Sequence, residues 1–212
     1  FVGLQHLAEF VEGGGVLVTL GNSGVVAVDG GMVRRVGRLS GGFNTPGSEL
    51  QAKVLRPLHP IAYGYPALPS IFRGNGPIWD VADLDRGFAV LQFGTKEVPA
   101  PDEEKESGAA AKNPAAANEI EVEDADAQPK AVAKKPEPKP AAAPKDKERR
   151  DLVLSGFVKG KDQVDGKPAI LDVPMGKGRV ILFAFNPLHR YLNHSDFRFV
   201  YNVILNWNDL PR

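Results

Sequence analysis

The sequence predicts an α/β fold, and three features of the chain support this class. The first is a helical pattern, a glycine run and a continuous apolar strand in direct succession at residues 3–20. The second is a pair of strands near the C-terminus that are separated by a short Lys-Gly turn. The third is an amphipathic helix that follows this hairpin and ends near Trp207. We therefore expect a sheet with flanking helices and a C-terminal hairpin plus helix.

The N-terminal elements follow from hydrophobic periodicity. A helix is predicted over residues 3–12, because apolar residues recur there at helical spacing and would share one face. Residues 13–15, all glycine, end this helix. The apolar run at residues 16–20 is typical of a fully buried strand in a parallel sheet. Four residues carry the helical pattern: Leu4, Leu7, Phe10 and Val11.

Two further strands are predicted in the first half of the chain, at residues 49–55 and 87–93. Between them lies a proline-rich stretch, residues 59–77, which is predicted to be an ordered surface excursion without regular elements. Its aromatic residues either pack into the core or serve as stacking platforms for a glycan or peptide. These residues are Tyr63, Tyr65, Phe72 and, just beyond the stretch, Trp79.

Residues 98–150 differ in composition from the rest of the chain. Aromatic residues are absent and Ala, Pro, Lys and Glu dominate, so the segment cannot bury enough apolar surface to offset its ordering entropy. We predict a disordered insertion in a surface loop, with a regulatory or partner-binding tail as the alternative. Each doubling of loop length adds only about 0.6 kcal/mol of closure cost. Residues 1–97 and 151–212 are therefore expected to be two parts of one domain.

After the insertion, strands are predicted at residues 152–158, 169–173 and 178–185, the last two forming an antiparallel hairpin. A helix follows. Ser195 is its predicted N-cap, and Asp196 lies in the first turn, where the helix dipole favours a negative charge. Four apolar residues are expected to dock this helix: Phe197, Val200, Ile204 and Trp207.

Composition argues against several classes of function. The 26 basic and 26 acidic residues cancel, so the basic excess typical of nucleic-acid binding is missing. The absence of cysteine excludes disulfides, thiolate metal ligands and cysteine nucleophiles. No apolar run approaches the roughly 20 residues that span a bilayer. The chain starts at Phe1 inside a predicted helix, which indicates a piece of a longer protein with any targeting signal upstream.

Two N-terminal motifs have both a functional and a structural interpretation. His6 and Glu9 have the H-x-x-E spacing of one class of zinc peptidase, but a catalytic zinc needs a third ligand, so we interpret them as solvent-facing. Residues 13–15 follow a helix, whereas a phosphate-binding loop follows a strand. Residues 20–24 leave the carboxyl end of a predicted parallel strand, where α/β sheets bind ligands. Both a ligand contact and an ordinary turn remain open for them.

The densest group of polar side chains lies between the last strand and the last helix, at residues 186–196. Such a position can present imidazole bases or bind an anion at a helix terminus. Because no nucleophile accompanies the histidines, structural hydrogen bonding and contacts between subdomains are the favoured interpretation. A hydrolase that uses one histidine with a serine or a bound metal is the enzymatic alternative. Residues 193–195 also match the glycosylation sequon. The candidate contact residues are His189, Arg190, His194 and Asp196.

Several separate blocks of the chain, in the same order, resemble the C-terminal region of large bacterial zinc carboxypeptidases of the carboxypeptidase A-like family. The resemblance covers the chain except for the insertion. In that family the region is similar to a class I glutamine amidotransferase-like domain of flavodoxin-like architecture. The blocks are residues 3–20, 45–50, 59–64, 176–185 and 189–197.

The resemblance implies a partial flavodoxin-like domain, whose first strands would precede Phe1. The domain would be a noncatalytic accessory module of a secreted or periplasmic zinc metallocarboxypeptidase. The zinc ligands and catalytic residues of that peptidase match no position here, so no catalytic, cofactor or metal residue is assigned and zinc belongs to the peptidase domain alone. His6 and Glu9 do not inherit the zinc role.

The resemblance also bears on chemistry and partners. An active amidotransferase uses a cysteine nucleophile, which this chain lacks, so the domain is expected to be a degenerate relative. The expected partner is the upstream peptidase domain of the same chain, with no nucleic acid and no membrane span. The alternatives are a glycan- or peptide-binding module and a degenerate amidotransferase-like hydrolase.

Overall fold

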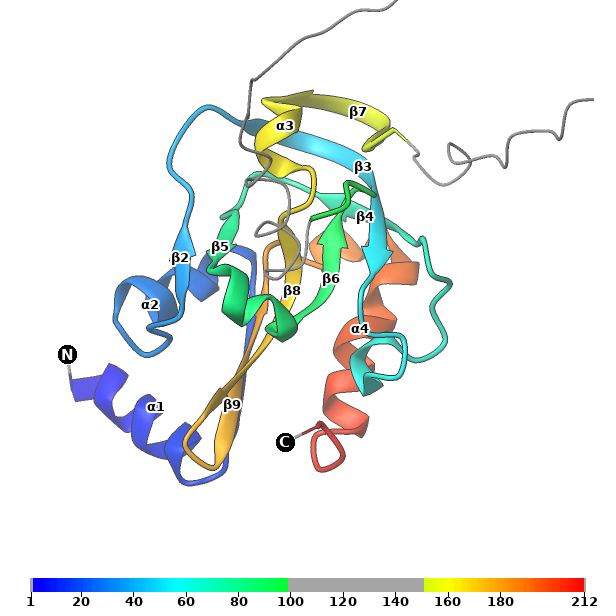
Figure 1. Cartoon of the computed structure of the whole chain (residues 1–212). Helices are drawn as coiled ribbons and strands as arrows, with labels where there is room; N and C mark the ends of the chain where they lie inside the picture. The colour runs from blue at the N-terminus through cyan, green and yellow to red at the C-terminus, as the bar shows by residue number, and fades with distance from the viewer. Residues whose placement is uncertain (1, 99–150, 212) are drawn as a thin grey trace, which may run out of the picture.

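The fold is built on one curled sheet whose strands come from both parts of the chain (Figure 1). The computed structural model describes residues 2–98 and 151–211, so the predicted insertion lies, apart from its first residue, outside the described residues. The strand order is β1-β9-β8-β6-β3-β4, and β7 pairs with β3. These strands are β1 Val16–Leu20, β3 Asn44–Val54, β4 Ser70–Arg73, β6 Ala89–Phe93, β7 Val153–Lys159, β8 Pro168–Met175 and β9 Gly178–Phe183.

The mixed α/β class, the flanking helices and the C-terminal hairpin followed by a helix are confirmed. β1 and β9 run parallel, with Val16 opposite Arg179 and Leu20 opposite Phe183. The other pairs of this sheet that the structure describes are antiparallel. A separate two-stranded sheet joins β2 (Val36–Arg38) to β5 (Trp79–Val81).

Helices cover both sides of the β8 and β9 hairpin. α1 (Val2–Glu12) and α2 (Gly24–Asp29) lie on one side in Figure 1, and α4 (His194–Leu205) lies on the other. A short helix, α3 (Lys161–Val164), connects β7 to β8. The hairpin between these layers forms the centre of the core: β9 is buried at every position and β8 over its first six residues. Their near-continuous apolar sequences reflect this burial on both faces.

α1 begins and ends close to its predicted bounds but buries less of its apolar face than predicted. Val11 is fully buried, whereas Leu7 and Phe10 are 41% and 57% exposed. α1 packs on β1 and β9, and β1 is the last strand of the sheet. Only part of the apolar face of α1 therefore finds a strand to cover.

The prediction for the N-cap of α4 was wrong, and the prediction for its buried face was confirmed at two of four residues. Asn193 occupies the N-cap position, and Ser195 lies in the first turn. Ile204 and Trp207 are 59% and 56% exposed, although Phe197 and Val200 are buried as predicted. The buried face of the helix differs from the predicted one because contacts to distant strands and loops determine which of its residues face inward. The buried residues of that face are Asp196, Phe197, Phe199, Val200 and Val203.

The proline-rich stretch is more regular than predicted. It contains a 3-10 turn, η2 (Pro60–Ala62), and the strand β4. β4 is short and pairs with β3 through Ser70 to Arg73, and the carbonyl of Pro69 before it accepts from the Ala52 N–H of β3 at 2.8 Å. β3 also begins earlier than predicted, at Asn44, with a register shift between Asn44 and Gly47 against β7. α2, β2 and β5 were not predicted.

Candidate functional site

The two segments that the sequence singled out for ligand contacts meet at one end of the parallel strand pair. The 3-10 turn η1 (Gly21–Ser23) follows β1, and residues 184–189 follow β9. They leave the sheet at the same edge because β1 and β9 are parallel. The Gly21 N–H donates to the Phe185 carbonyl at 3.0 Å, which ties the two segments together.

A cavity of about 380 Å³ lies at this edge, and we call it the β1–β9 cavity. Its lining comes from η1, from the end of β4 with the loop after it, from Pro46 and from the segment after β9. The volume is in the usual range for sites that hold a small molecule or a short stretch of chain. The polar or ring side chains in the lining are Asn22, Ser23, Phe72, Asn75, Phe185, Asn186 and His189.

Arg73 holds two walls of the β1–β9 cavity in place. Its side chain is fully buried and donates to the Ala184 carbonyl after β9. It also donates to the carbonyls of Gly76 at 2.9 Å and Pro77 at 3.1 Å, in the loop after β4. Burial lowers the pKa of Arg73 to about 10, so the guanidinium remains charged at neutral pH. These hydrogen bonds therefore hold the two walls in position without the help of a ligand.

Three asparagine amides provide hydrogen-bonding groups. Asn75 Oδ1 accepts from the Thr45 N–H at 2.9 Å, and Asn186 Oδ1 accepts from the Leu188 N–H at 3.0 Å. With its oxygen engaged, each of these side chains is oriented and keeps its NH₂ group for another acceptor. The Asn22 side chain is exposed and has no hydrogen-bond partner among the described residues.

His189 adds an imidazole to this lining. Its ring stacks on the Phe72 ring, with centroids 5.3 Å apart and 20° between the planes. The imidazole is partly exposed, so the stack forms a wall with an apolar ring and a polar edge. His189 is the one candidate contact residue that the structure places in the cavity lining.

Ser23 also lines the cavity, but its hydroxyl serves the backbone. Its Oγ accepts from the Leu20 N–H at 2.8 Å and donates to the Leu20 carbonyl at 3.0 Å. A nucleophilic serine needs a general base within hydrogen-bond reach, and no such bond to Ser23 exists among the described residues. Among the described residues, the cavity lining thus offers hydrogen-bonding groups but no serine that is paired with a general base.

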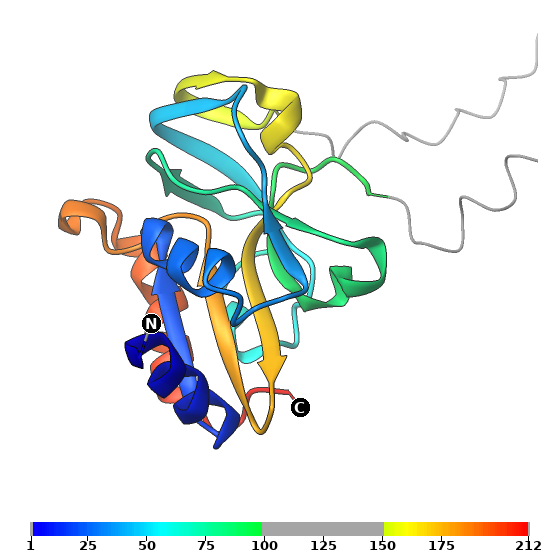
Figure 2. The same ribbon diagram turned by 90° about the vertical axis from the view of Figure 1, so that its left-hand side faces the viewer.

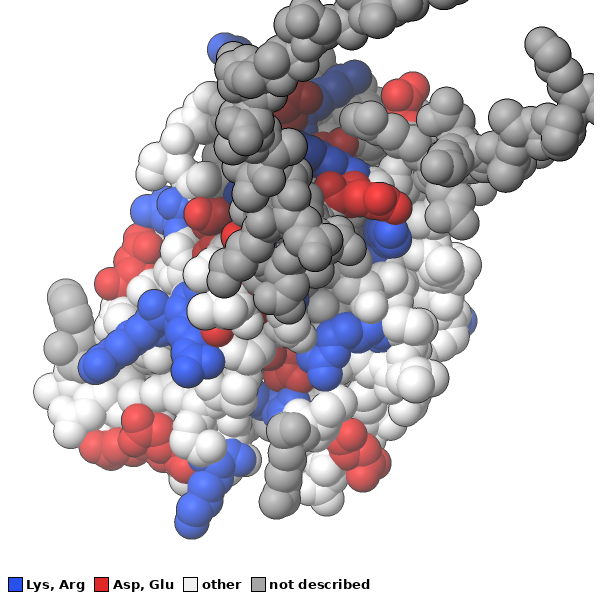
Figure 3. Space-filling view, in the orientation of Figure 1, with Lys and Arg blue, Asp and Glu red and all other residues white. Residues whose placement is uncertain are grey.

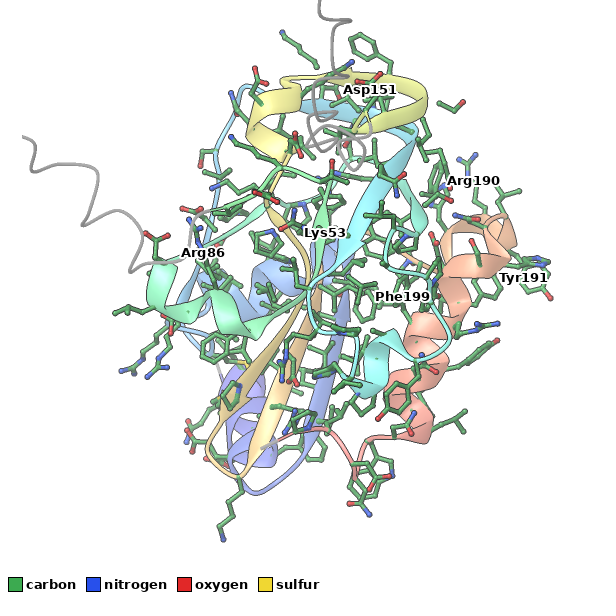
Figure 4. The ribbon with its side chains drawn as sticks, turned by 45° about the vertical axis from the view of Figure 1, so that its right-hand side comes forward. Lys53, Arg86, Asp151, Arg190, Tyr191 and Phe199 are labelled. Carbon is green, nitrogen blue, oxygen red and sulfur yellow. The ribbon has the colours of Figure 1, made fainter. Side chains whose placement is uncertain are left out.

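Arg190 and His194 lie outside the cavity. Arg190 and Tyr191 both have positive φ angles, 50° and 56°, which is a strained conformation for residues other than glycine. Figure 4 shows their side chains at the outer end of the loop before α4, with Tyr191 pointing away from the sheet. His194 is exposed, and its Nε2 lies 3.1 Å from the Tyr191 carbonyl.

Asp196 lies behind the cavity. It is fully buried, and its Oδ2 accepts from the Phe72 N–H at 3.0 Å, which fixes the strand that carries Phe72. Burial raises the pKa of Asp196 to about 7; the Phe72 N–H opposes this shift and the charge of Glu49 adds to it. Asp196 is therefore a support of the cavity wall.

A buried charged network lies near the other end of β9, and sequence reasoning missed it. His59, Asp172 and Arg179 are joined through Asp172 Oδ2, at 2.8 Å from His59 Nε2 and 2.6 Å from Arg179 Nη1. The sequence did contain a signal for this network: one charged residue in each of two otherwise apolar strands, Asp172 in β8 and Arg179 in β9. Because Arg179 stands opposite Val16, at the start of β1, the network is remote from the cavity after Leu20.

A larger hollow of about 630 Å³ lies between β3, β6, β8 and the 3-10 segment η3 (Asp83–Phe88). Its charges are partly paired: Lys167 Nζ lies 2.6 Å from Asp80 Oδ1, and Asp165 accepts from the Lys96 N–H at 3.3 Å. Val98, the last residue described before the gap, belongs to its rim. Because polar groups of the lining already bond to one another, we assign no site to this hollow.

The described residues do not form a metal site. No group of three or more His, Asp or Glu side chains in residues 2–98 and 151–211 could hold an ion. His6 and Glu9 are exposed on α1, and Glu9 accepts from Gln5 Nε2 at 2.9 Å. His6 and Glu9 thus form no part of a three-ligand cluster within the described residues.

The four aromatic candidates divide between core and surface. Trp79 is fully buried and cannot be a stacking platform for a ligand. Tyr65 stacks on Phe199 at 3.7 Å, Phe72 stacks on His189, and Tyr63 is exposed. Phe72 alone among them lines the β1–β9 cavity.

No family model, curated protein or solved structure matches the chain. Within the part of the chain that the structure describes, no helix is both long and apolar enough to cross a bilayer. On the face drawn in Figure 3, basic and acidic side chains are interspersed. Because the comparisons supply no related site, the candidate functional site rests on the geometry of the β1–β9 cavity alone.

Proposed function

We propose that the chain is a noncatalytic accessory domain of a secreted or periplasmic zinc metallocarboxypeptidase, and that it holds a peptide in the β1–β9 cavity. One observation carries the proposal. The cavity lies at the carboxyl ends of two parallel strands and offers oriented amides and an imidazole without an activated nucleophile. The parent enzyme is taken from the resemblance of the separate sequence blocks to the C-terminal region of carboxypeptidase A-like proteins.

A peptide suits the chemistry of this lining. The NH₂ groups of Asn75 and Asn186 can donate to backbone carbonyls, while the Asn22 amide can both donate and accept. The stacked rings of Phe72 and His189 give an apolar wall for one side chain of the ligand. Binding at this cavity would keep a substrate segment close to the proposed peptidase domain.

The experiment is calorimetric titration of the chain with tetrapeptides that carry a free carboxyl terminus, in parallel with chitooligosaccharides. We expect heat of binding from peptides, and about tenfold weaker binding after His189→Ala because one wall of the cavity is lost. Asn22→Ala should weaken binding in the same direction. His194→Ala is the matched control, since His194 is exposed and lies outside the cavity lining.

Three outcomes would contradict the proposal. Binding of the oligosaccharide alone would assign the cavity to glycans. Equal affinities of the His189→Ala and His194→Ala variants would show that peptides bind outside the cavity. Turnover of a peptide or ester by the chain, abolished by His189→Ala in a variant with an unchanged circular dichroism spectrum, would make the domain an enzyme.

A further inference from the structure

A second hollow adjoins the β1–β9 cavity, and we call it the Arg38 hollow. It has a volume of about 360 Å³, and its lining comes from η1, α2, β2 with the residues after it, and the loop after β4. Asn22 and Asn75 line both spaces. Figure 2 shows α2, in blue, beside the orange segment that follows β9. The two spaces therefore meet at two amide side chains.

The two shared side chains lie close to each other. A Cβ at Gly76 would lie 4.0 Å from Asn22 Oδ1, so the Asn22 amide lies against the loop that carries Asn75. Asn75 is itself fixed to the start of β3 by the Thr45 N–H. A peptide that leaves the β1–β9 cavity at this point meets amide groups, which can bond to its backbone.

Buried hydrogen bonds hold the walls of the Arg38 hollow as well. Arg73 donates to the carbonyls of Gly76 at 2.9 Å and Pro77 at 3.1 Å, and both residues line this hollow. On the opposite strand the Leu39 N–H donates to the Ile78 carbonyl at 3.0 Å. One buried guanidinium thus orders the loop that borders both spaces.

The lining of the Arg38 hollow combines apolar groups with one positive charge. Of the described residues that line the two spaces, Arg38 is the one of the Lys, Arg, Asp and Glu types. A ligand that extends from one space into the other therefore passes neutral groups and then reaches a cation. The apolar residues of this hollow are Val25, Leu39, Phe43 and Pro77.

Arg38 retains hydrogen-bond donors for a ligand. Its Nη2 donates to Asp29 Oδ2 at 2.9 Å, and both side chains are nearly half exposed, so their ion pair is weak. A guanidinium has five N–H donors. The other N–H groups of Arg38 have no partner within residues 2–98 and 151–211.

We propose that a peptide held in the β1–β9 cavity continues past Asn22 and Asn75 into the Arg38 hollow, where one of its carboxylates binds the Arg38 guanidinium. This inference rests on the proposed function. Adjacent N–H groups of arginine match the two oxygens of a carboxylate. The apolar lining suits the hydrocarbon part of the residue that carries the carboxylate. That residue is the C-terminal one or has an acidic side chain, and the experiment distinguishes the two sources.

The test is calorimetric titration with three N-acetylated tetrapeptides. The first is acetyl-Ala-Ala-Ala-Leu with a free carboxyl terminus, the second is its C-terminal amide, and the third is acetyl-Ala-Ala-Ala-Glu amide. We expect at least one carboxylate peptide to bind about fivefold more tightly than the neutral amide, and Arg38→Gln to remove this difference. Arg34→Gln is the matched control, because Arg34 is exposed in the same segment and lines neither space.

Asp29→Asn separates a direct contact from a structural role of Arg38. Removal of the Asp29 carboxylate frees the Arg38 guanidinium, so the carboxylate peptide should bind at least as tightly as to the parent chain. If Arg38 acted only through its pair with Asp29, Asp29→Asn and Arg38→Gln would weaken binding equally, which would overturn the proposal.

The remaining outcomes separate this inference from the proposed function. Equal affinities of the three peptides, or a preference that persists in Arg38→Gln, would overturn the inference alone, provided that His189→Ala still weakens the neutral amide. A carboxylate preference that needs Arg38 but not His189 would support the Arg38 hollow and contradict binding in the β1–β9 cavity. Absence of binding by all three peptides would overturn both.

Discussion

Asp172 and Arg179 form an ion pair inside the sheet, with Asp172 Oδ2 2.6 Å from Arg179 Nη1. The same carboxylate oxygen bonds to His59 Nε2 at 2.8 Å. His59 Nδ1 accepts from the Ile61 N–H at 3.3 Å, so the ring proton lies on Nε2 and is donated to Asp172. Arg179 Nη2 also donates to the Pro211 carbonyl at 2.6 Å. The network thus joins the loop after β3, the hairpin and the C-terminal segment.

Replacing Asp172 with asparagine should strongly lower the free energy of unfolding. Asp172→Asn leaves the Arg179 guanidinium, which is largely buried, without its counter-charge, and breaking a buried pair in this way costs about 3 kcal/mol. Urea denaturation followed by circular dichroism measures the loss. Asp162→Asn is the control, because Asp162 is exposed on α3 and its loss should cost at most about 0.5 kcal/mol. Equal effects of the two substitutions would show that the pair contributes nothing.

Asp196 should make the protein less stable as pH rises from about 4 to 7. Burial raises its pKa from 3.8 to about 7, so over this range the unfolded carboxyl has lost its proton while the folded one keeps it. The free energy of unfolding then falls by at most about 1.4 kcal/mol per pH unit from this group.

Asp196→Asn should remove this contribution while its Oδ1 still accepts from the Phe72 N–H. The stability of the variant relative to the parent should therefore increase from pH 4 to pH 8 in urea denaturation. Asp162→Asn supplies the control, since Asp162 is exposed on α3. A constant difference for Asp196→Asn would mean that the carboxyl titrates normally in the folded protein.

Elements with a strong local signal could be predicted from the sequence. α1, β1, β8 and β9 lie within a few residues of their predicted bounds, because each has helical periodicity or a long apolar run. β2, β4 and β5 have three or four residues each, too few for a periodic pattern. They form because partner strands distant in the sequence supply their hydrogen bonds.

The candidate site shows the same division. Residues 20–24 and 186–190 were recognisable because each follows an apolar strand, and both segments contribute residues to the cavity lining. Asn75 was not recognised, and Phe72 was considered only as a stacking platform of the proline-rich stretch, since β4 reaches the cavity only by pairing with β3. The buried face of α4 also could not be predicted from the local sequence pattern, because a distant contact helps to set it. Asp196 accepts a hydrogen bond from the Phe72 N–H, 124 residues away in sequence.

Tyr65→Phe should loosen α4 without changing its apolar packing. The Tyr65 hydroxyl donates to the Ser195 carbonyl and accepts from the Phe199 N–H at 3.1 Å, both in the first turns of α4. Burial raises the pKa of Tyr65 well above its usual value, so the hydroxyl stays protonated. Losing both bonds should lower the free energy of unfolding by about 1–2 kcal/mol in thermal denaturation.

Tyr63→Phe is the matched control for Tyr65→Phe. Tyr63 is exposed, and its hydroxyl makes no hydrogen bond to the described residues, so its removal should leave the melting temperature unchanged. If both variants melted with the parent, the hydroxyl of Tyr65 would not hold α4 in solution.

Gly178→Ala should be among the most damaging single-methyl changes in the described chain. A Cβ at Gly178 would lie 2.1 Å from the Gly15 carbonyl oxygen and 2.2 Å from that of Val11. Both are backbone atoms at the junction of α1 and β1, where the Lys177 N–H donates to the Glu12 carbonyl at 3.0 Å. Relieving the clash would separate the hairpin turn from this junction, so we expect a loss of about 3 kcal/mol in urea denaturation.

Gly3→Ala tests the same chemical change where space is open. A Cβ at Gly3 meets no atom within 4 Å, and Gly3 lies inside α1. Alanine there restricts the unfolded chain and favours the helix, so it should stabilise by about 0.5–1 kcal/mol. If the free energy of unfolding falls for Gly178→Ala and rises for Gly3→Ala, the loss at Gly178 is caused by the close approach of β9 to the α1–β1 junction. A loss of similar size at both positions would instead show that glycine is needed for reasons unrelated to this contact.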